Sequence, residues 1–280
     1  MSTSGNVLRC KDTLVDLRLP AVMGVLNVTP DSFSDGGRFL DTEAAVRHGI
    51  SLAEQGAAFI DVGGESTRPG ADPVGVEEEL RRVIPVIERL RGATAALISI
   101  DTSKPEVMRA AAAAGAALIN DVRALREPGA LAAARDSGCG VCLMHMQGEP
   151  RTMQHEPVYA DVVSEVRAFL AERVAACRSA GIEAQRLAVD PGFGFGKTLE
   201  HNLTLLRHLG ALSAVGRPLA VGLSRKSMVG KLTGHPEGER VLGSVVLAVL
   251  AALAGASIVR AHDVAATVEA LRVVTAVRGH

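Results

Sequence analysis

The sequence feature that most constrains the fold is an eightfold alternation of short apolar runs with helix-forming stretches. The runs are rich in β-branched residues and end in polar ones; they are 22–29, 58–64, 97–102, 118–122, 141–146, 187–192, 219–224 and 257–263. Runs that are apolar along their whole length are typical of buried parallel strands. The helix-forming stretches that follow them are 43–55, 76–91, 105–114, 129–137, 158–180, 200–209, 237–254 and 264–278.

Eight strand–helix units in 280 residues predict an α/β protein with the (β/α)8 TIM barrel architecture. An open doubly wound sheet is the competing interpretation, but it usually has five or six strands. The first 20 residues lie outside the eight units. Within them, 7–9 and 14–17 are expected to form a short N-terminal hairpin that closes the bottom of the barrel. Because no linker or low-complexity tract interrupts the pattern, we expect residues 1–280 to form a single domain.

Composition and charge exclude several classes of function. Apolar residues make up 48% of the chain and charged residues 22%, which is typical of a globular protein and not of a disordered one. A net charge of −1, no Trp, one Tyr and six Phe make a nucleic-acid-binding surface unlikely. The uncharged stretch 241–259 is broken at Gly255, so its helical part is too short to cross a membrane. We therefore expect a cytoplasmic protein, with this helix buried or in a subunit interface.

Two local patterns point to chemistry that the rest of the sequence does not support. Cys139 and Cys142 form a CxxC, but they run directly into an apolar strand rather than a helix N-terminus, so a redox role is not expected. The segment 190–198 (DPGFGFGKT) is similar to a phosphate-binding loop. It lacks the first glycine of that motif, because position 191 is Pro.

The chemistry of a barrel enzyme is expected where its strands end. Nearly every predicted strand ends in a strong hydrogen-bonding group: Asn27, Asp61, Asp101, Asn120, Asp121, His145, Asp190, Ser224, Arg225, Lys226, Arg260, His262 and Asp263. Of these, Asp61 and Asp121 are interpreted as structural. The loops 27–37, 63–73 and 224–231 are lid candidates, since they are rich in turn-forming residues.

These strand-end groups indicate a class of substrate. Acceptors on Asp101, Asn120 and Asp190 suit a flat polar heterocycle with several N–H donors. A cationic set made of Arg68, Arg260 and His262 suits an anion such as a pyrophosphate. Together they predict a transferase-like barrel that binds a polar ring beside an anionic leaving group.

Seven segments, in order, resemble the dihydropteroate synthase family, the folate-biosynthesis enzymes that sulfonamides block. They are 24–37 (GVLNVTPDSFSDGG), 61–71 (DVGGESTRPGA), 100–102 (IDT), 119–121 (IND), 190–198, 222–230 (GLSRKSMVG) and 259–264 (VRAHDV). The resemblance extends from about residue 20 to residue 278. It implies condensation of 6-hydroxymethyl-7,8-dihydropterin pyrophosphate with p-aminobenzoate, giving 7,8-dihydropteroate and pyrophosphate. It also implies sulfonamides as competitors, and, with the apolar helix 241–254, a homodimer.

The resemblance further implies roles for individual residues. Those matching pterin-binding positions are Asp101, Asn120, Met144, Asp190, Phe195, Gly222 and Lys226. Those matching the p-aminobenzoate region are Phe33, Thr67, Arg68, Pro69, Phe195, Lys226 and Ser227. Those matching pyrophosphate positions are Asn27, Ser66, Arg68, Arg260 and His262, with Mg²⁺ as cofactor at Asn27. The expected catalytic set is Arg68, Asp101, Lys226, Arg260 and His262, and Asp35 is a weaker candidate to offset positive charge on the ring.

Two other functions remain open from the sequence. A pterin-dependent methyltransferase would share a pterin-binding barrel, but it passes a methyl group to a corrinoid partner protein. It would not need Arg68 or the SRK segment 224–226 for a pyrophosphate. A catalytically inactive pterin-binding paralogue is the second alternative, and the intact anion-binding residues argue against it.

Overall fold

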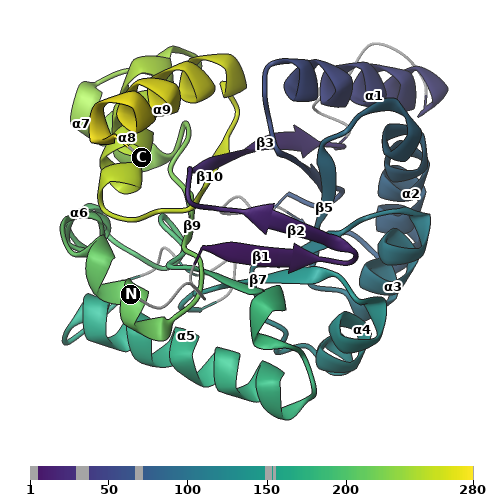
Figure 1. Ribbon diagram of the computed structural model, residues 1–280, viewed down its shortest axis with the longest axis horizontal. Helices are drawn as coiled ribbons and strands as arrows, with labels where there is room; N and C mark the ends of the chain where they lie inside the picture. The colour runs from purple at the N-terminus through teal and green to yellow at the C-terminus, as the bar shows by residue number, and fades with distance from the viewer. Residues whose placement is uncertain (1–5, 30–37, 67–71, 149–152, 154–155, 280) are drawn as a thin grey trace.

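The computed structural model describes residues 6–29, 38–66, 72–148, 153 and 156–279, and these residues form a barrel of parallel strands ringed by helices (Figure 1). The barrel strands are β3 (Ala21–Asn27), β4 (Phe59–Gly63), β5 (Leu97–Asp101), β6 (Leu118–Asp121), β7 (Gly140–Met144), β8 (Leu187–Asp190), β9 (Ala220–Gly222) and β10 (Ile258–Ala261). Their order in the sheet is β8-β7-β6-β5-β4-β3-β10-β9. A parallel bridge between Val189 and Leu219 joins the two ends of this sheet, so the predicted (β/α)8 barrel is confirmed.

The outer ring consists of α1 (Arg38–Glu54), α2 (Val76–Ala93), α3 (Pro105–Ala114), α4 (Ala130–Ser137), α5 (Val162–Ser179), α6 (Leu199–Arg207), α7 (Ser227–Thr233), α8 (Val241–Leu253) and α9 (Val264–Arg278). All eight predicted helices are present; α3 and α9 have the predicted ends, and the other six have shifted ends. Helix α5 begins at Val162 rather than 158 because Asp161 caps it, accepting bonds from the amides of Val163 and Ser164.

Helix α7 is the element that sequence analysis missed. It begins within the segment 224–231, which the sequence predicted to be a loop, and extends two residues beyond it. Its seven residues include Gly230, so its helical signal was weak, and Gly234 ends it at a φ of 77°. The predicted lid at this position is therefore in part a helix.

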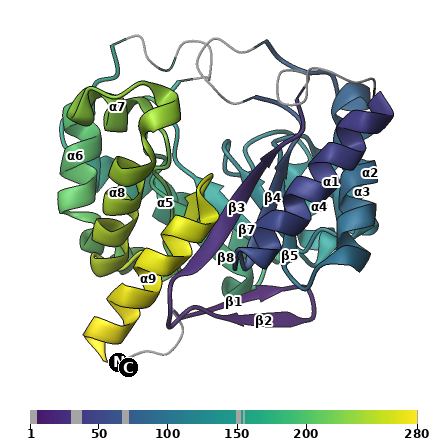
Figure 2. The same ribbon diagram turned by 90° about the horizontal axis from the view of Figure 1, so that it is seen from above.

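The N-terminal hairpin lies across the end of the barrel from which the strands start (Figure 2). It consists of β1 (Val7–Cys10) and β2 (Thr13–Asp16), paired antiparallel. Leu8, Cys10 and Leu17 are buried there against Met23 and Phe59 inside the barrel. The predicted closure of the barrel bottom by a hairpin is thus confirmed.

The barrel interior changes from apolar to polar along the strands. Side chains alternate across a strand, so residues two apart share a face. The lower interior layer contains Met23, Phe59, Leu118, Cys142, Ala188, Ala220 and Ile258 in one apolar cluster with the hairpin. Two residues further on, the upper layer is Val25, Asp61, Asn120, Met144, Asp190, Gly222 and Arg260. The hairpin end is therefore a packed core, and polar groups gather at the other end.

The remaining negative expectations concern cysteines and membrane spans. All four cysteines are buried and free, and burial raises the pKa of Cys139 and, further, that of Cys142. Neither thiol therefore favours the reactive thiolate. Among the residues that the structure describes, no helix is both long enough and apolar enough to cross a bilayer.

Candidate active site at the carboxyl end of the barrel

The centre of the site is Asp61, a fully buried carboxylate on β4. Its Oδ1 accepts a hydrogen bond from the Ser99 hydroxyl at 2.6 Å. Its Oδ2 accepts from Arg260 Nε at 2.6 Å and from Asn120 Nδ2 at 3.1 Å. Sequence analysis assigned Asp61 a structural role. The structure places it in direct contact with two predicted site residues, which it holds through these hydrogen bonds.

Arg260 on β10 bridges two carboxylates. Besides its bond to Asp61, its Nη2 donates to Asp101 Oδ2 at 3.0 Å. Burial, followed by the neighbouring charge of Asp61, raises the pKa of Asp101 to about 7, and Arg260 opposes this rise. These two contacts use two of the five N–H groups of a guanidinium. Within the described residues, Asp101 Oδ1 is buried and has no hydrogen-bond partner.

Asp190 and Lys226 face each other across the mouth. The Asp190 carboxylate at the end of β8 accepts the amide of Gly192 at 2.7 Å, and burial raises its pKa. The Lys226 ammonium donates to the carbonyl of Phe193 and lies 4.6 Å from the centre of the Phe195 ring. Burial lowers the pKa of Lys226 to about 8, although the charge of Asp190 works against this shift.

An apolar wall completes this part of the site. Met144, the last residue of β7, forms a buried cluster with Val122, Met146 and Met153, and the Phe195 side chain packs against it. Gly222, at the end of β9, leaves space beside the two cations. A Cβ added there would lie 3.7 Å from Lys226 Nζ and 3.9 Å from Arg260 Cβ. The structure thus brings together the predicted set Asp101, Asn120, Met144, Asp190, Phe195, Gly222, Lys226 and Arg260.

The groups predicted to bind an anion lie beside this set. His262, just after β10, is held by Ser224, whose hydroxyl is 3.0 Å from its Nδ1 and accepts its backbone amide at 3.1 Å. Arg225 and Asp263 form an ion pair that connects the segments carrying Lys226 and His262. Ser227 is exposed at the start of α7.

Asn27 is the described residue predicted to hold a metal ion. It ends β3 and lies close to Gly63 and Asp101. A Cβ added to Gly63 would lie 3.6 Å from Asp101 Cβ and 3.8 Å from Asn27 Oδ1. Ser66 lies beyond β4 and is half-buried. Phe33, Asp35, Thr67, Arg68 and Pro69 lie outside the described residues.

Two residues read from the sequence as strand-end groups prove to hold loops. Asp121 accepts bonds from the Ser103 hydroxyl and from the amides of Arg123 and Leu125, as its predicted structural role requires. His145 is buried, and its Nδ1 lies 2.9 Å from the ammonium of Lys197.

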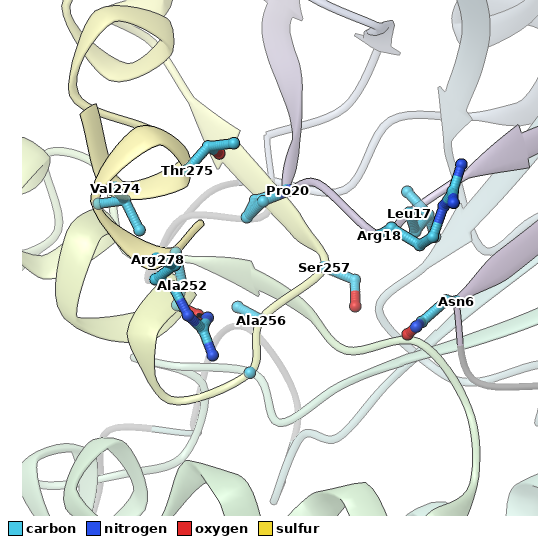
Figure 3. Close-up of a pocket in the computed structure, with 11 residues that line it drawn as sticks. Asn6, Leu17, Arg18, Pro20, Ala252, Ala256, Ser257, Val274, Thr275 and Arg278 are labelled. Atoms are coloured by element: carbon cyan, nitrogen blue, oxygen red, sulfur yellow. Dashed lines mark hydrogen bonds between the residues drawn. The ribbon is translucent and has the colours of Figure 1, made fainter. Parts of the chain in front are cut away.

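A cavity of about 190 Å³ lies at the opposite end of the molecule (Figure 3). Its lining includes Pro20 and Ser257, which directly precede β3 and β10, and Arg278 of α9. It is therefore on the hairpin side of the barrel, separated by the apolar lower layer from the charged residues of the mouth.

The geometry defines the class of protein as a (β/α)8 barrel with a site for a small polar ring. The carboxylates of Asp61, Asp101 and Asp190 and the cations of Lys226 and Arg260 lie over an apolar wall. Among the described residues, the buried Oδ1 of Asp101 has no hydrogen-bond donor. Comparison with known proteins agrees: the family described as pterin binding enzyme matches residues 23–262.

Similar proteins identify the family more narrowly. The dihydropteroate synthase of Escherichia coli (strain K12) is 55% identical over 269 residues, covering 96% of this chain and 95% of the relative. A Xanthomonas albilineans dihydropteroate synthase solved with 4-aminobenzoic acid matches with a TM-score of 0.93 and 56% identity, covering 99% of both chains. A Yersinia pestis dihydropteroate synthase solved with a sulfonamide drug complex matches with a TM-score of 0.92 and 51% identity, covering 97% of this chain and 98% of that chain. The chain belongs to the pterin binding enzymes and, among them, to the dihydropteroate synthases, transferases that make dihydropteroate.

Proposed function

We propose that this barrel condenses 6-hydroxymethyl-7,8-dihydropterin pyrophosphate with p-aminobenzoate, using the residues gathered at the carboxyl ends of its strands. The observation that carries the assignment is the unpartnered, buried Asp101 Oδ1 beside the side chains of Asn120 and Asp190. An unpaired buried acceptor costs roughly 1–3 kcal/mol, which a ligand N–H would recover. A pterin edge, with several ring and amino N–H groups, supplies such donors.

Each pterin contact has a separate basis. Asn120 gives one N–H to Asp61, which turns its amide so that Oδ1 and the second N–H remain for the ring. Asp190 accepts ring donors, and Lys226 donates to the ring carbonyl. Met144 and Phe195 cover the ring faces, while Gly222 leaves room for the ring edge.

The reaction needs stabilisation of a leaving anion more than a strong base. The arylamine nucleophile is neutral, so loss of pyrophosphate first leaves a carbocation-like CH2 group conjugated with the dihydropterin. Arg260 and His262, together with Arg68, Ser66 and Asn27, bind the departing pyrophosphate. Asp101, and Asp35 to a lesser degree, offset the positive charge that develops on the ring.

The arylamine is expected to approach from the loop side of the mouth. Lys226 lies over the Phe195 ring, and Ser227 follows it at the start of α7, so these three residues are proposed to border the arylamine. Phe33, Thr67, Arg68 and Pro69 are proposed to complete the p-aminobenzoate site. Holding the amine in line with the CH2 group removes much of the entropic barrier of a two-substrate reaction. A sulfonamide, which mimics p-aminobenzoate, would compete for the same place.

A magnesium ion fits this arrangement if the substrate supplies most of its ligands. Among the described residues, no group of three or more His, Cys, Asp or Glu side chains is placed to hold a metal ion. Mg²⁺ usually keeps several waters and binds through one or two protein oxygens plus substrate phosphates, and the Asn27 amide oxygen at the mouth is such a ligand. When bound, the ion would neutralise part of the pyrophosphate charge.

The experiment that tests the function measures pyrophosphate release from purified protein mixed with the pterin pyrophosphate, p-aminobenzoate and Mg²⁺. Release that depends on p-aminobenzoate and yields dihydropteroate supports the proposal. Tight pterin binding without release would favour the inactive paralogue. Methyl transfer to a corrinoid protein would favour the methyltransferase.

A homodimer is proposed from the outer face of α8 and α9. Four α8 side chains, Leu242, Val246, Leu250 and Leu253, are 76%, 49%, 47% and 51% exposed, and on α9 Val277 is 81% exposed. The spacing of the four α8 residues places them on one apolar stripe, which a second copy would cover. Leu250→Glu is expected to give a monomeric mass in light scattering at micromolar concentration, whereas Leu14→Glu, on strand β2 of the hairpin, should not. A dimer that survives Leu250→Glu would refute this surface. We further propose a cytoplasmic location, as the composition suggests.

A further inference from the structure

The glycine-rich segment 190–198, which resembles a phosphate-binding loop, contains a lysine whose ammonium contacts the protein's own acceptors. Lys197 is 2% exposed. Its ammonium lies 2.9 Å from each of three acceptors: the carbonyls of Gly192 and Phe195 and the Nδ1 of His145. An ammonium has three N–H donors and no acceptor, so these contacts use all of its hydrogen-bonding capacity.

Two further side chains hold the same segment. Asn202 accepts the amide of Gly194 at 2.8 Å and donates to the carbonyl of Lys197 at 3.3 Å. Tyr159 donates its hydroxyl to the carbonyl of Gly196 at 2.8 Å. We call Lys197, His145, Tyr159 and Asn202 the loop clasp. Its members come from the end of β7, the segment before α5, the segment after β8, and α6.

Two glycines of the same segment also restrict its backbone. Gly192 has a φ of 67°, and a Cβ there would lie 1.9 Å from the carbonyl oxygen of His145. Gly196 has a φ of 60°, and a Cβ there would lie 2.3 Å from the carbonyl oxygen of Gln147. At Gly192 and Gly196 the backbone therefore lies directly on the segment that follows β7, and only glycine fits at these two positions.

This segment in turn positions Lys226. The Phe193 carbonyl accepts a hydrogen bond from the Lys226 ammonium, and the Phe195 ring lies beneath that ammonium. A Cβ added to Gly194 would lie 3.2 Å from Lys226 Cδ. We propose that the loop clasp is a positioning device for the substrate site: it fixes the 192–196 backbone so that Phe193 and Phe195 hold Lys226 against the bound ring. Lys197 thus acts through other residues and touches no substrate. The inference rests on the proposed function in one respect, the roles of Phe195 and Lys226.

The test is a double-mutant cycle between the clasp and the wall that it positions. Lys197→Met keeps an unbranched side chain one atom shorter and removes its three donors, and Phe195→Leu removes the ring. Lys197→Met alone should weaken calorimetric binding of 7,8-dihydropteroate and lower kcat/KM for p-aminobenzoate by about tenfold or more. In the double variant, binding should be no more than about threefold weaker than in the worse single variant, because one positioned group is lost in both cases.

Lys11→Met is the matched control. Lys11 also donates to a backbone carbonyl, that of Ala112 at 2.6 Å, but from the hairpin at the far end of the barrel. When Lys11→Met is combined with Phe195→Leu, the losses in the free energy of dihydropteroate binding should be additive. Tyr159, the single tyrosine in a chain without tryptophan, supplies an optical signature. Its near-ultraviolet circular dichroism should change in Lys197→Met and not in Lys11→Met.

Each outcome decides the matter. Unchanged binding in Lys197→Met, or additive losses with Phe195→Leu, overturns the clasp while leaving the proposed function standing. If the wild-type protein neither binds dihydropteroate nor releases pyrophosphate, the proposed function itself fails. Should Lys197→Met not unfold cooperatively, Tyr159→Phe replaces it in the cycle, and additivity there overturns the proposal equally.

Discussion

Replacing Asp61 separates the geometry of the site from its charge. Asp61→Asn keeps the shape of the side chain. Its amide oxygen can take the place of Oδ2, where it still accepts from Arg260 and Asn120, and its NH2 then faces Ser99, whose hydroxyl can rotate to accept. Asp61→Ala instead removes the acceptor of two buried donors, on Ser99 and Asn120, and of the half-buried Arg260.

The magnitudes follow from these bonds. Losing the charge but keeping the bonds should lower the free energy of unfolding by about 1 kcal/mol, the difference between charged and neutral hydrogen bonds. Leaving three donors unpaired at about 1–3 kcal/mol each should lower it by at least roughly 3 kcal/mol. Asn120 would also lose the bond that orients its amide, so dihydropteroate binding should weaken at least about tenfold, the equivalent of one such bond.

Urea unfolding and calorimetric binding, measured on the same preparations, check both numbers. Asp61→Asn is expected to bind within a few-fold of the wild type. Wild-type stability and affinity in Asp61→Ala would refute the idea that Asp61 organises the site. Equal damage in the two variants would show that the charge of Asp61, rather than its geometry, matters.

Three further predictions concern the charged residues around it. Arg260→Ala should lower turnover by about 100-fold or more, since one donor to developing charge contributes that much; because it also leaves Asp61 and Asp101 without their cation, stability should fall by about 3–5 kcal/mol. A near-normal rate in a folded variant would remove Arg260 from leaving-group stabilisation. Asp190→Ala should abolish measurable pterin binding with the fold intact by circular dichroism, and unchanged calorimetric affinity would contradict its role. The pKa of Asp101 is higher in the folded than in the unfolded chain, so its contribution to stability is full below about pH 4 and is lost as the pH rises to about 7. Unfolding free energies measured across that window should decline less steeply with pH in Asp101→Asn, and equal slopes would contradict the shift.

Much of the fold could be predicted because its signals are local. Burial of strands on both faces leaves continuous apolar runs, and helices must end before the next strand begins. Gly56, Gly115 and Gly255 end three of the predicted helices, and all three have positive φ. Helix α7 was not predicted because seven residues with an internal glycine give little helical periodicity of apolar residues. The start of α5 was misplaced because a side-chain cap, rather than periodicity, sets it.

The sequence was enough to predict which residues line the site, but not which of them are hydrogen-bonded to one another. Strand-end positions and family motifs identified Asp101, Asn120, Asp190, Lys226 and Arg260, and the structure brings them to one mouth. Nothing local distinguished Asp61 from Asp121, since both are acidic residues within strand-end motifs. One accepts from the site residues Asn120 and Arg260, and the other accepts from loop amides and a serine.

Periodicity and glycine positions are properties of neighbouring residues, so the sequence was enough to predict the number of strand–helix units, the closing hairpin and the polar residues at strand ends. Which of those groups become partners depends on the closed barrel. Arg260 meets Asp61 across 199 positions of the chain, and Lys197 turns inward to His145 across 52. A buried polar group must be satisfied by whatever the closed barrel places within hydrogen-bond reach, and that distance is set by the packing of the whole ring of strands.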